Sequence, residues 1–249
     1  MPMDQTLTVL TVAVCLMLGG VLKGATGAGA PLLAVPALAL LFDVRFAIIV
    51  MLVPNTMTNI WQGWKFRHHI PETAFMVPLL IGSVLGVLLG TYLLATVPLT
   101  VLPLFLAAAV FGYVVLRLSK PDWVLGMRQA KRIALPIGTL AGVLQGASGI
   151  SAPVSITFLN AIRLPRPVFI ATISLFFTAF SVFQLLALWG SGVADAHSLL
   201  ISLFALAPIA AGMPIGAQIA KRVSPAVFDK AILVLLSLIA LRLVIGYFG

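Results

Sequence analysis

The sequence predicts an all-α polytopic integral membrane protein built from two inverted repeats, and three observations lead to this fold class. Hydrophobic residues make up 61% of the 249-residue chain and charged residues only 8%, whereas an ordinary soluble domain is about 25% charged. Long apolar runs recur along the whole chain, and a Gly-rich segment occurs twice. A soluble protein of this composition would lack polar residues for its surface, so we expect that surface to face lipid.

Ten apolar runs are bounded by charged residues or by Gly and Pro. A helix needs roughly 20 apolar residues to span the hydrocarbon of a bilayer, and six runs reach about that length: 46–64, 74–94, 99–118, 168–189, 198–220 and 226–248. Four runs are shorter and form two pairs joined by Gly-rich links: 7–22 with 30–42, and 133–144 with 150–162. Each pair is either a re-entrant hairpin or two short tilted spans. The N-terminus has no basic leader, so we expect no cleaved signal peptide.

The internal repeat is clearest at the two links. Residues 20–31 (GVLKGATGAGAP) align with residues 142–153 (GVLQGASGISAP) at an offset of 122, with eight of twelve positions identical. Further along, Gly86 and Gly90 resemble Gly212 and Gly216. The repeat predicts three parts, namely transmembrane repeat 1 at 1–118, a cytoplasmic linker at 119–130 and transmembrane repeat 2 at 131–249.

The loop charges indicate that the second repeat is inverted, as an odd number of crossings in each repeat requires. The basic loop 65–69 has an uncharged counterpart at 190–194, whereas the uncharged turn 95–98 corresponds to a loop with Lys221 and Arg222. The positive-inside rule places the charged loops in the cytoplasm and both chain termini outside. Arg45, beside Asp43, is the one loop cation on the opposite side.

The links are the first candidate binding site, because they fall at the expected depth of the membrane centre. Irregular backbone there must be buried in protein or line a cavity, and a helix that begins at such a break directs free N–H groups toward an anion. The alternative is close helix packing through small residues. The predicted substrate-binding residues of the links are Gly24, Thr26, Gly27, Gly29, Gly146, Ser148, Gly149 and Ser151.

Uncharged polar side chains at helical spacing form the second candidate site. They are Asn55, Asn59 and Gln62 in the first repeat and Thr178, Ser181 and Gln184 in the second. We expect them to bind an oxyanion in a cavity, the alternative being hydrogen bonds that fasten the bundle. Lys23, whose counterpart is the neutral Gln145, completes the predicted site. It either attracts the anion or extends to a membrane interface.

Other function classes find little support in the sequence. None of the six acidic residues lies in the middle of an apolar run, so no carboxylate proton relay is expected. Cys15 is the only cysteine, and no residue spacing indicates a nucleophile or a metal site, so we expect neither an enzyme nor a cofactor. The net charge of +9 lies in short loops and indicates topology rather than nucleic-acid binding. The expected partners are a small anion and the lipid bilayer, with homo-oligomerisation left open.

The repeated links and the prolines after them resemble the TauE/SafE family of sulfite and organosulfonate exporters. The matching residues are Gly20, Gly24, Gly27, Gly29, Pro31 and Pro36 in the first half, and Gly142, Gly146, Gly149 and Pro153 in the second. Ala28, Ala30, Ile150 and Ser151 depart from the glycine pattern of that family. The resemblance implies export of sulfite, sulfoacetate or a similar C2–C3 sulfonate from the bacterial cytoplasm across the inner membrane.

We therefore predict a transporter that works by alternating access around the paired links. The alternatives are an anion channel of the same architecture and an importer of a related anion. A purely structural membrane subunit would not need polar ends on half-length helices.

Overall fold

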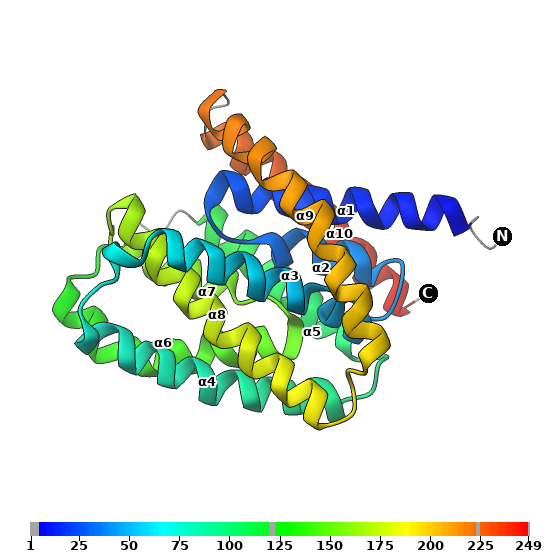
Figure 1. The fold of residues 1–249 in the computed structure, drawn as a ribbon, viewed down its shortest axis with the longest axis horizontal. Coiled ribbons are helices and arrows are strands. Elements are labelled where there is room, and N and C mark those ends of the chain that lie inside the picture. The colour runs from blue at the N-terminus through cyan, green and yellow to red at the C-terminus, as the bar shows by residue number, and fades with distance from the viewer. Residues whose placement is uncertain (1–4, 120–122, 223–224, 249) are drawn as a thin grey trace.

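The computed structural model describes residues 5–119, 123–222 and 225–248, and within these ranges the secondary structure is helical (Figure 1). The prediction of an all-α polytopic protein is confirmed. The helices of the first half are α1 (Gln5–Thr26), α2 (Ala30–Ala39), α3 (Val44–Lys65), the short 3-10 helix η1 (Arg67–His69), α4 (Thr73–Thr96) and α5 (Leu102–Leu118). Those of the second half are α6 (Met127–Ser148), α7 (Ala152–Ala161), α8 (Arg166–Gly190), α9 (Ala196–Arg222) and α10 (Pro225–Phe248).

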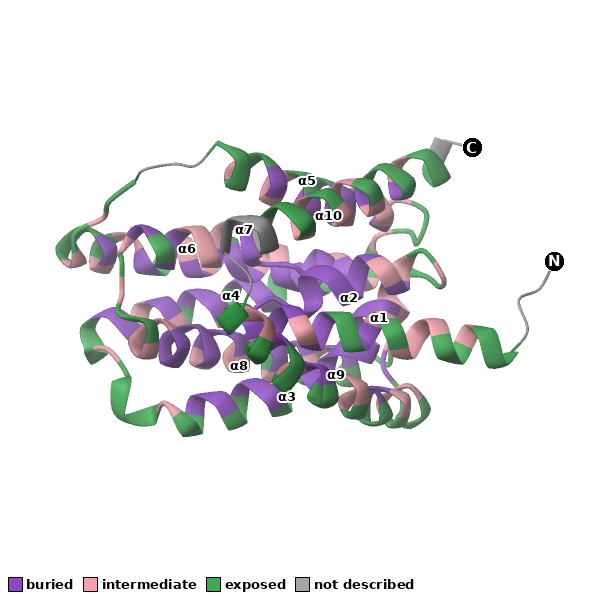
Figure 2. Cartoon of the chain, turned by 90° about the horizontal axis from the view of Figure 1, so that it is seen from above, coloured by how far each residue is buried: buried purple, intermediate pink, exposed green. Residues whose placement is uncertain are grey.

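The outer surface of the bundle is apolar, as lipid contact requires. Large hydrophobic side chains are exposed along the outer helices, among them Leu85 and Leu89 of α4, Phe204 of α9 and Leu238 of α10. Exposed residues lie mainly on the peripheral helices and buried ones on the central helices (Figure 2). In the described part of the chain, α1, α3, α4, α8, α9 and α10 are long and apolar enough to cross a membrane.

Three of the expected run lengths are wrong, since the short run 133–144 also belongs to a helix of 22 residues, α6. The run 7–22 was expected to be short, yet α1 has 22 residues, because the helix continues through Gly24 and ends only at Thr26. The run 99–118 was expected to span, yet α5 has 17 residues, because its helix begins only at Leu102, after the turn that follows Pro98. A single glycine lowers the stability of a helix by only about 1 kcal/mol relative to alanine. Packing against neighbouring helices can offset this loss, so a helix can continue past a glycine.

Each short pair is therefore one long helix followed by a half-length helix, so of the two alternatives, a re-entrant hairpin or two short tilted spans, the second is wrong. Helices α2 and α7 have 10 residues each. At 1.5 Å per residue such a helix rises only about 15 Å, half of the roughly 30 Å hydrocarbon thickness. Eight of the ten residues of α2 are buried, so protein surrounds this half-length helix.

The most deeply buried of the long helices, α3 and α8, pack against each other at the centre of the bundle. They run antiparallel, since Gly63 of α3 lies against Ser174 of α8 while Asn55 and Gln184 line a common cavity. Around them, α1 packs on α9, α4 on α6 and α5 on α10. The repeat makes α1 equivalent to α6 and α4 to α9, so exchanging the two halves converts one of these helix pairs into the other.

Glycines hold the α1–α9 and α4–α6 pairs at very close range. Gly82, Gly86 and Gly90 of α4 face the backbone of α6, and Gly138, Gly142 and Gly146 of α6 face the backbone of α4. In the same way, Gly20 and Gly24 of α1 face α9, whose Gly212 and Gly216 face α1. We call these two contacts the glycine seams. Both seams join the first half of the chain to the second.

Two side chains form hydrogen bonds with backbone groups that would otherwise have no partner within their helix. Pro54 removes an N–H from the middle of α3, so the carbonyl of Val50 loses its usual partner. Ser202 of α9 donates to that carbonyl at 3.0 Å and accepts from the N–H of Val53 at 3.0 Å. Arg45 donates to the carbonyl oxygens of Leu94, Ala95 and Val97 at 2.7–2.9 Å. The cation that departs from the positive-inside pattern thus caps the C-terminus of α4.

Candidate functional site

Both links end their long helix in the same way. The N–H of Gly27 donates to the carbonyl of Lys23 at 2.7 Å, and the N–H of Gly149 donates to that of Gln145 at 2.8 Å. Both glycines have positive φ angles, 84° and 73°, which L-residues with a Cβ rarely adopt. The glycine shared by the two copies is therefore required by the backbone turn that stops each helix.

The hydroxyl groups of the links also occupy equivalent positions. Thr26 Oγ1 donates to the carbonyl of Leu22 at 2.8 Å, and Ser148 Oγ donates to that of Leu144 at 2.7 Å. Each oxygen also accepts from the N–H two residues later, at 3.3 and 3.4 Å. Since a hydroxyl has a single proton, both hydroxyls are engaged with the chain ends they stabilise, and their predicted role as donors to an anion stays a prediction.

The two links differ at the residue that precedes each half-length helix. Gly29 has a φ of 94° and comes directly before α2, whereas Ser151 has a φ of −105° and comes directly before α7. Ser151 can therefore replace glycine without strain, which explains this departure from the glycine pattern. Pro31 and Pro153 lie in the first turn of α2 and α7, where the missing proline N–H costs nothing because it has no partner within the helix.

A small cavity at the centre of the bundle is lined by residues from both halves of the chain. Its polar lining consists of Asn55 from α3, Gln145 from α6 and Gln184 from α8. Pro31 at the start of α2 and Gly149 of the second link also line it. The apolar remainder is Val35, Ile48, Met51 and Leu52. The volume is about 10 Å³, close to the minimum for one water molecule, so an oxyanion enters only if the surrounding helices move apart.

A chain of hydrogen bonds connects this cavity to the fully buried Lys23. The ammonium Nζ of Lys23 donates to Oδ1 of Asn59 at 2.6 Å. Nδ2 of Asn59 donates in turn to Oδ1 of Asn55 at 2.8 Å. Each amide thus accepts on the lysine side, which leaves the NH₂ group of Asn55 as the donor at the cavity. Hydrogen bonds in such a chain polarise one another, and a protonated Lys23 would strengthen them.

Lys23 has no acidic partner among the described residues. Its side chain is 0% exposed, and its one hydrogen bond in the described structure goes to a neutral amide. The alternative that Lys23 extends to a membrane interface is therefore wrong. A buried ion costs several kcal/mol in lost hydration, and neutral amides offset only part of that cost.

Of the remaining predicted polar residues, Gln184 lines the cavity, whereas Gln62, Thr178 and Ser181 do not. Gln62 is buried, with its Oε1 unpaired in the described structure and its Nε2 3.7 Å from the position a Cβ would take on Gly27. Gln184 donates to the carbonyls of Gly146 and Gln145 at 3.2 and 3.4 Å. Thr178 and Ser181 donate to carbonyls of their own helix. The second-repeat hydroxyls thus stabilise α8 locally.

Two of the predicted link residues lie in the glycine seams. A Cβ on Gly24 would overlap the carbonyl of Met213, and one on Gly146 would lie 2.5 Å from the N–H nitrogen of Thr91. For these residues the geometry is that of close helix packing, which was the alternative interpretation.

Sequence reasoning missed the apolar lining of the cavity. Met51 could have been found, since it precedes Asn55 by one helical turn and shares its face.

The comparison with protein families decides the relationship of this chain to known proteins. A family model described as the sulfite exporter TauE/SafE matches residues 12–243, nearly the whole chain. The chain belongs to the TauE/SafE family. The resemblance of the glycine links is confirmed, and membership of this transporter family agrees with the multi-pass helical bundle. No curated protein and no solved structure shows significant similarity to the chain.

Proposed function

We propose that this TauE/SafE protein exports a small sulfur oxyanion or organosulfonate, such as sulfite or sulfoacetate, by alternating access around the central cavity. The observation that carries the proposal is the buried Lys23, whose charge has no acidic partner among the described residues. An anion in the cavity would supply the missing counter-charge, reached through Asn59 and Asn55. In the second half Gln145 replaces the lysine, so the site is asymmetric.

Movement of the two halves would follow from the arrangement of the cavity. Its polar residues come from both halves, and its volume of about 10 Å³ cannot hold a tetrahedral or pyramidal oxyanion. An open channel would require a continuous path at this point, so the closed cavity favours a carrier. The inverted topology, with both termini outside the inner membrane, would place the two half-length helices on opposite sides of the site.

Export requires no coupling ion on energetic grounds. An anion that leaves a cell with an inside-negative potential gains about 2.3 kcal/mol per charge and 100 mV. That gain supports roughly a fiftyfold outward gradient of a monovalent sulfonate, since about 1.4 kcal/mol is a factor of ten. We infer electrogenic export, in which Lys23 lowers the cost of placing the anion in the membrane interior.

The test is efflux of sulfite or sulfoacetate from vesicles that contain the purified full-length protein. Lys23→Gln, which copies the residue of the second repeat, should weaken anion binding roughly ten- to hundredfold, as expected for the loss of a hydrogen-bonding charge. Lys65→Gln removes a lysine from the exposed end of α3 and is the matched control. Thermal stabilisation by sulfite reports binding separately from transport.

Three outcomes would contradict the proposal. Lys23→Gln protein that is folded and transports at the wild-type rate would exclude the counter-charge role. Flux that does not saturate with substrate would favour the channel. Flux that a proton or sodium gradient drives, while an imposed potential does not, would exclude potential-driven export.

A further inference from the structure

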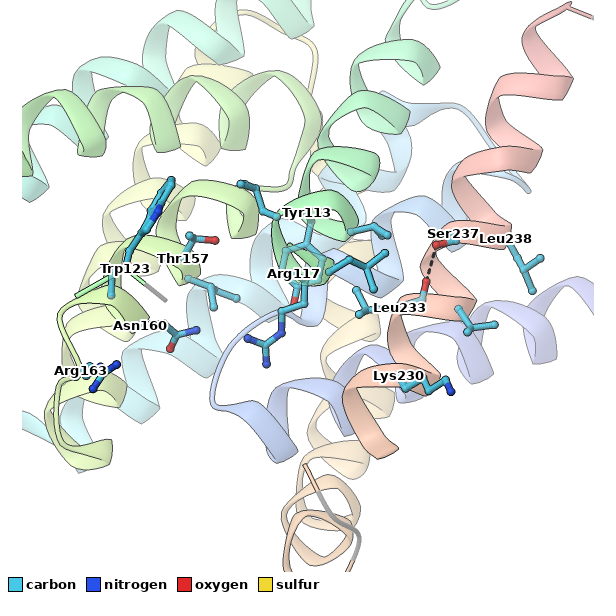
Figure 3. Close-up of a pocket in the computed structure, with 16 residues that line it drawn as sticks. Tyr113, Arg117, Trp123, Thr157, Asn160, Arg163, Lys230, Leu233, Ser237 and Leu238 are labelled. Atoms are coloured by element: carbon cyan, nitrogen blue, oxygen red, sulfur yellow. Dashed lines mark hydrogen bonds between the residues drawn. The ribbon is translucent and has the colours of Figure 1, made fainter. Parts of the chain in front are cut away.

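A second, much larger cavity lies at the periphery of the bundle, between α5, α7 and α10 (Figure 3). Its volume is about 900 Å³, within the 300–1,000 Å³ range typical of ligand pockets. It shares no lining residue with the central cavity. The face of α7 that lines it contains Ile156, Thr157 and Asn160, whereas Phe158 and Leu159 of the same helix are buried in the core. One face of α7 therefore lines this pocket while another packs into the core.

The basic side chains of this pocket lie at the ends of its three helices, with Arg163 and Lys230 on opposite sides of Arg117 in Figure 3. Arg117 lies in the last turn of α5, Arg163 follows the C-terminus of α7, and Lys230 lies near the start of α10. All three side chains are exposed. In Figure 3, Arg117 and Lys230 lie below Tyr113 and Ser237, which come one and two turns further into the bundle. Among the described residues that line the pocket, none is acidic.

The wall beyond the cations is apolar. It is formed by Val114 and Leu116 of α5, Ile156 of α7, and Leu233, Val234 and Leu238 of α10. The one hydroxyl on the α10 side, Ser237, donates to the carbonyl of Leu233 at 2.8 Å and so presents little polarity to the pocket. A basic end followed by an apolar wall matches an amphiphile with an anionic head and a hydrocarbon tail.

The repeat shows that the basic end is not a consequence of the fold alone. Arg163 corresponds to Leu41 at the offset of 122 residues, and Arg117 and Lys230 correspond to Leu243 and Leu104 at the offset of 126 residues that relates Gly86 to Gly212. The cations are therefore confined to one of two equivalent places. Arg128, Lys131 and Arg132, in the first two turns of α6, follow the pocket residue Trp123 closely in the chain. Basic pockets between transmembrane helices at the cytoplasmic surface bind anionic lipid headgroups.

From these observations we propose that the α5–α7–α10 pocket binds an anionic phospholipid, with its headgroup along the edge that contains Arg117, Arg163 and Lys230 and an acyl chain along α10. The transported anion is a poor fit, because a small, fully hydrated anion gains nothing from the long apolar wall. The lipid would hold α10 and α5 together with the half-length helix α7, whose N-terminus adjoins the central site.

Trp123 makes the proposal testable, because it lines the pocket. The chain has four tryptophans, so replacing Trp61, Trp64 and Trp189 by Phe leaves Trp123 as the only indole. This protein is reconstituted in phosphatidylcholine vesicles, and phosphatidylglycerol with brominated chains is added as a quencher. We expect phosphatidylglycerol to quench Trp123 at mole fractions more than tenfold lower than brominated phosphatidylcholine does.

The cations should account for that preference. Arg163→Gln and Lys230→Gln should each lower it about fivefold, the effect of one cation near an anionic membrane surface, and the double variant should show almost none. Arg128→Gln, which removes an exposed cation outside the pocket, should leave it unchanged. Native mass spectrometry of the solubilised protein, counting retained phosphatidylglycerol, gives a second readout that does not depend on the tryptophan replacements.

Several results would overturn the proposal. Equal quenching by both lipids would mean ordinary contact with the bilayer. Recovery of fluorescence by millimolar glycerol 3-phosphate would mean that the pocket binds a free phosphate and not a lipid. A dimer that forms only when the pocket cations are intact, without retained lipid, would mean that a second copy of the chain covers this face.

Discussion

The α4–α6 glycine seam gives a stability prediction whose size follows from the structure. A Cβ on Gly142 would lie 2.5 Å from the carbonyl oxygen of Ser83, 2.7 Å from the nitrogen of Val87 and 2.9 Å from the carbonyl carbon of Gly86. Ordinary Cβ contacts begin at 3.4 Å, so Gly142→Ala must push the helices apart by nearly 1 Å. A gap of that size forfeits a quarter to a half of the dispersion attraction along the seam.

We expect Gly142→Ala to lower the free energy of unfolding by about 1–3 kcal/mol, the usual cost of overpacking. Gly112 of α5 is the matched control, because nothing lies within 4 Å of its would-be Cβ. Gly112→Ala should be neutral or stabilising by up to about 1 kcal/mol, the helix-propensity gain. The assay is thermal unfolding of both detergent-solubilised variants. A Gly142→Ala protein as stable as the Gly112→Ala protein would refute the seam as a close-packed contact.

Three further predictions concern topology, capping and the site. In a Cys15→Ser background, a membrane-impermeant thiol reagent should label Ser191→Cys on intact cells and His68→Cys only after the cells are opened; labelling of both from one side would exclude the inverted repeat. Arg45→Gln should destabilise the protein by about 1.5–3 kcal/mol, measured by thermal unfolding, and an unchanged stability would mean that the α4 carbonyls find other partners. Asn55→Asp keeps the shape of the side chain but adds a negative charge at the cavity, so vesicle efflux should fall at least tenfold, whereas normal efflux would place the anion elsewhere.

The fold class could be predicted well from the sequence, because membrane helices appear as long runs of apolar residues. All ten apolar runs correspond to helices, and the repeat correctly paired the links through Gly27 and Gly149. The run lengths were less predictable. A glycine inside a helix and a glycine that ends one look alike in sequence, and only tertiary packing decides that Gly24 continues α1 while Gly27 stops it.

The candidate site could be predicted only in part. The polar positions of α3 were visible as helical spacing, and Asn55 and Asn59 are buried and joined to Lys23. The sequence could not show which glycines pack against a neighbouring helix and which end a helix, because both roles require the absence of a Cβ. The role of Arg45 was also hidden, since its partners are backbone carbonyls about 50 residues later in the chain.

The two seams have a consequence for how the protein is made. Each joins a helix of the first half to one of the second, so neither half can complete its own packing. At about 5–20 residues per second of synthesis, the 192 residues from Gly20 to Gly212 leave the glycine face of α1 without its partner for roughly 10–38 s. The 56 residues from Gly86 to Gly142 leave that of α4 without its partner for roughly 3–11 s. A chain truncated after the first half would expose the glycine faces of α1 and α4 without their partners, and it could pair through them with another copy of itself.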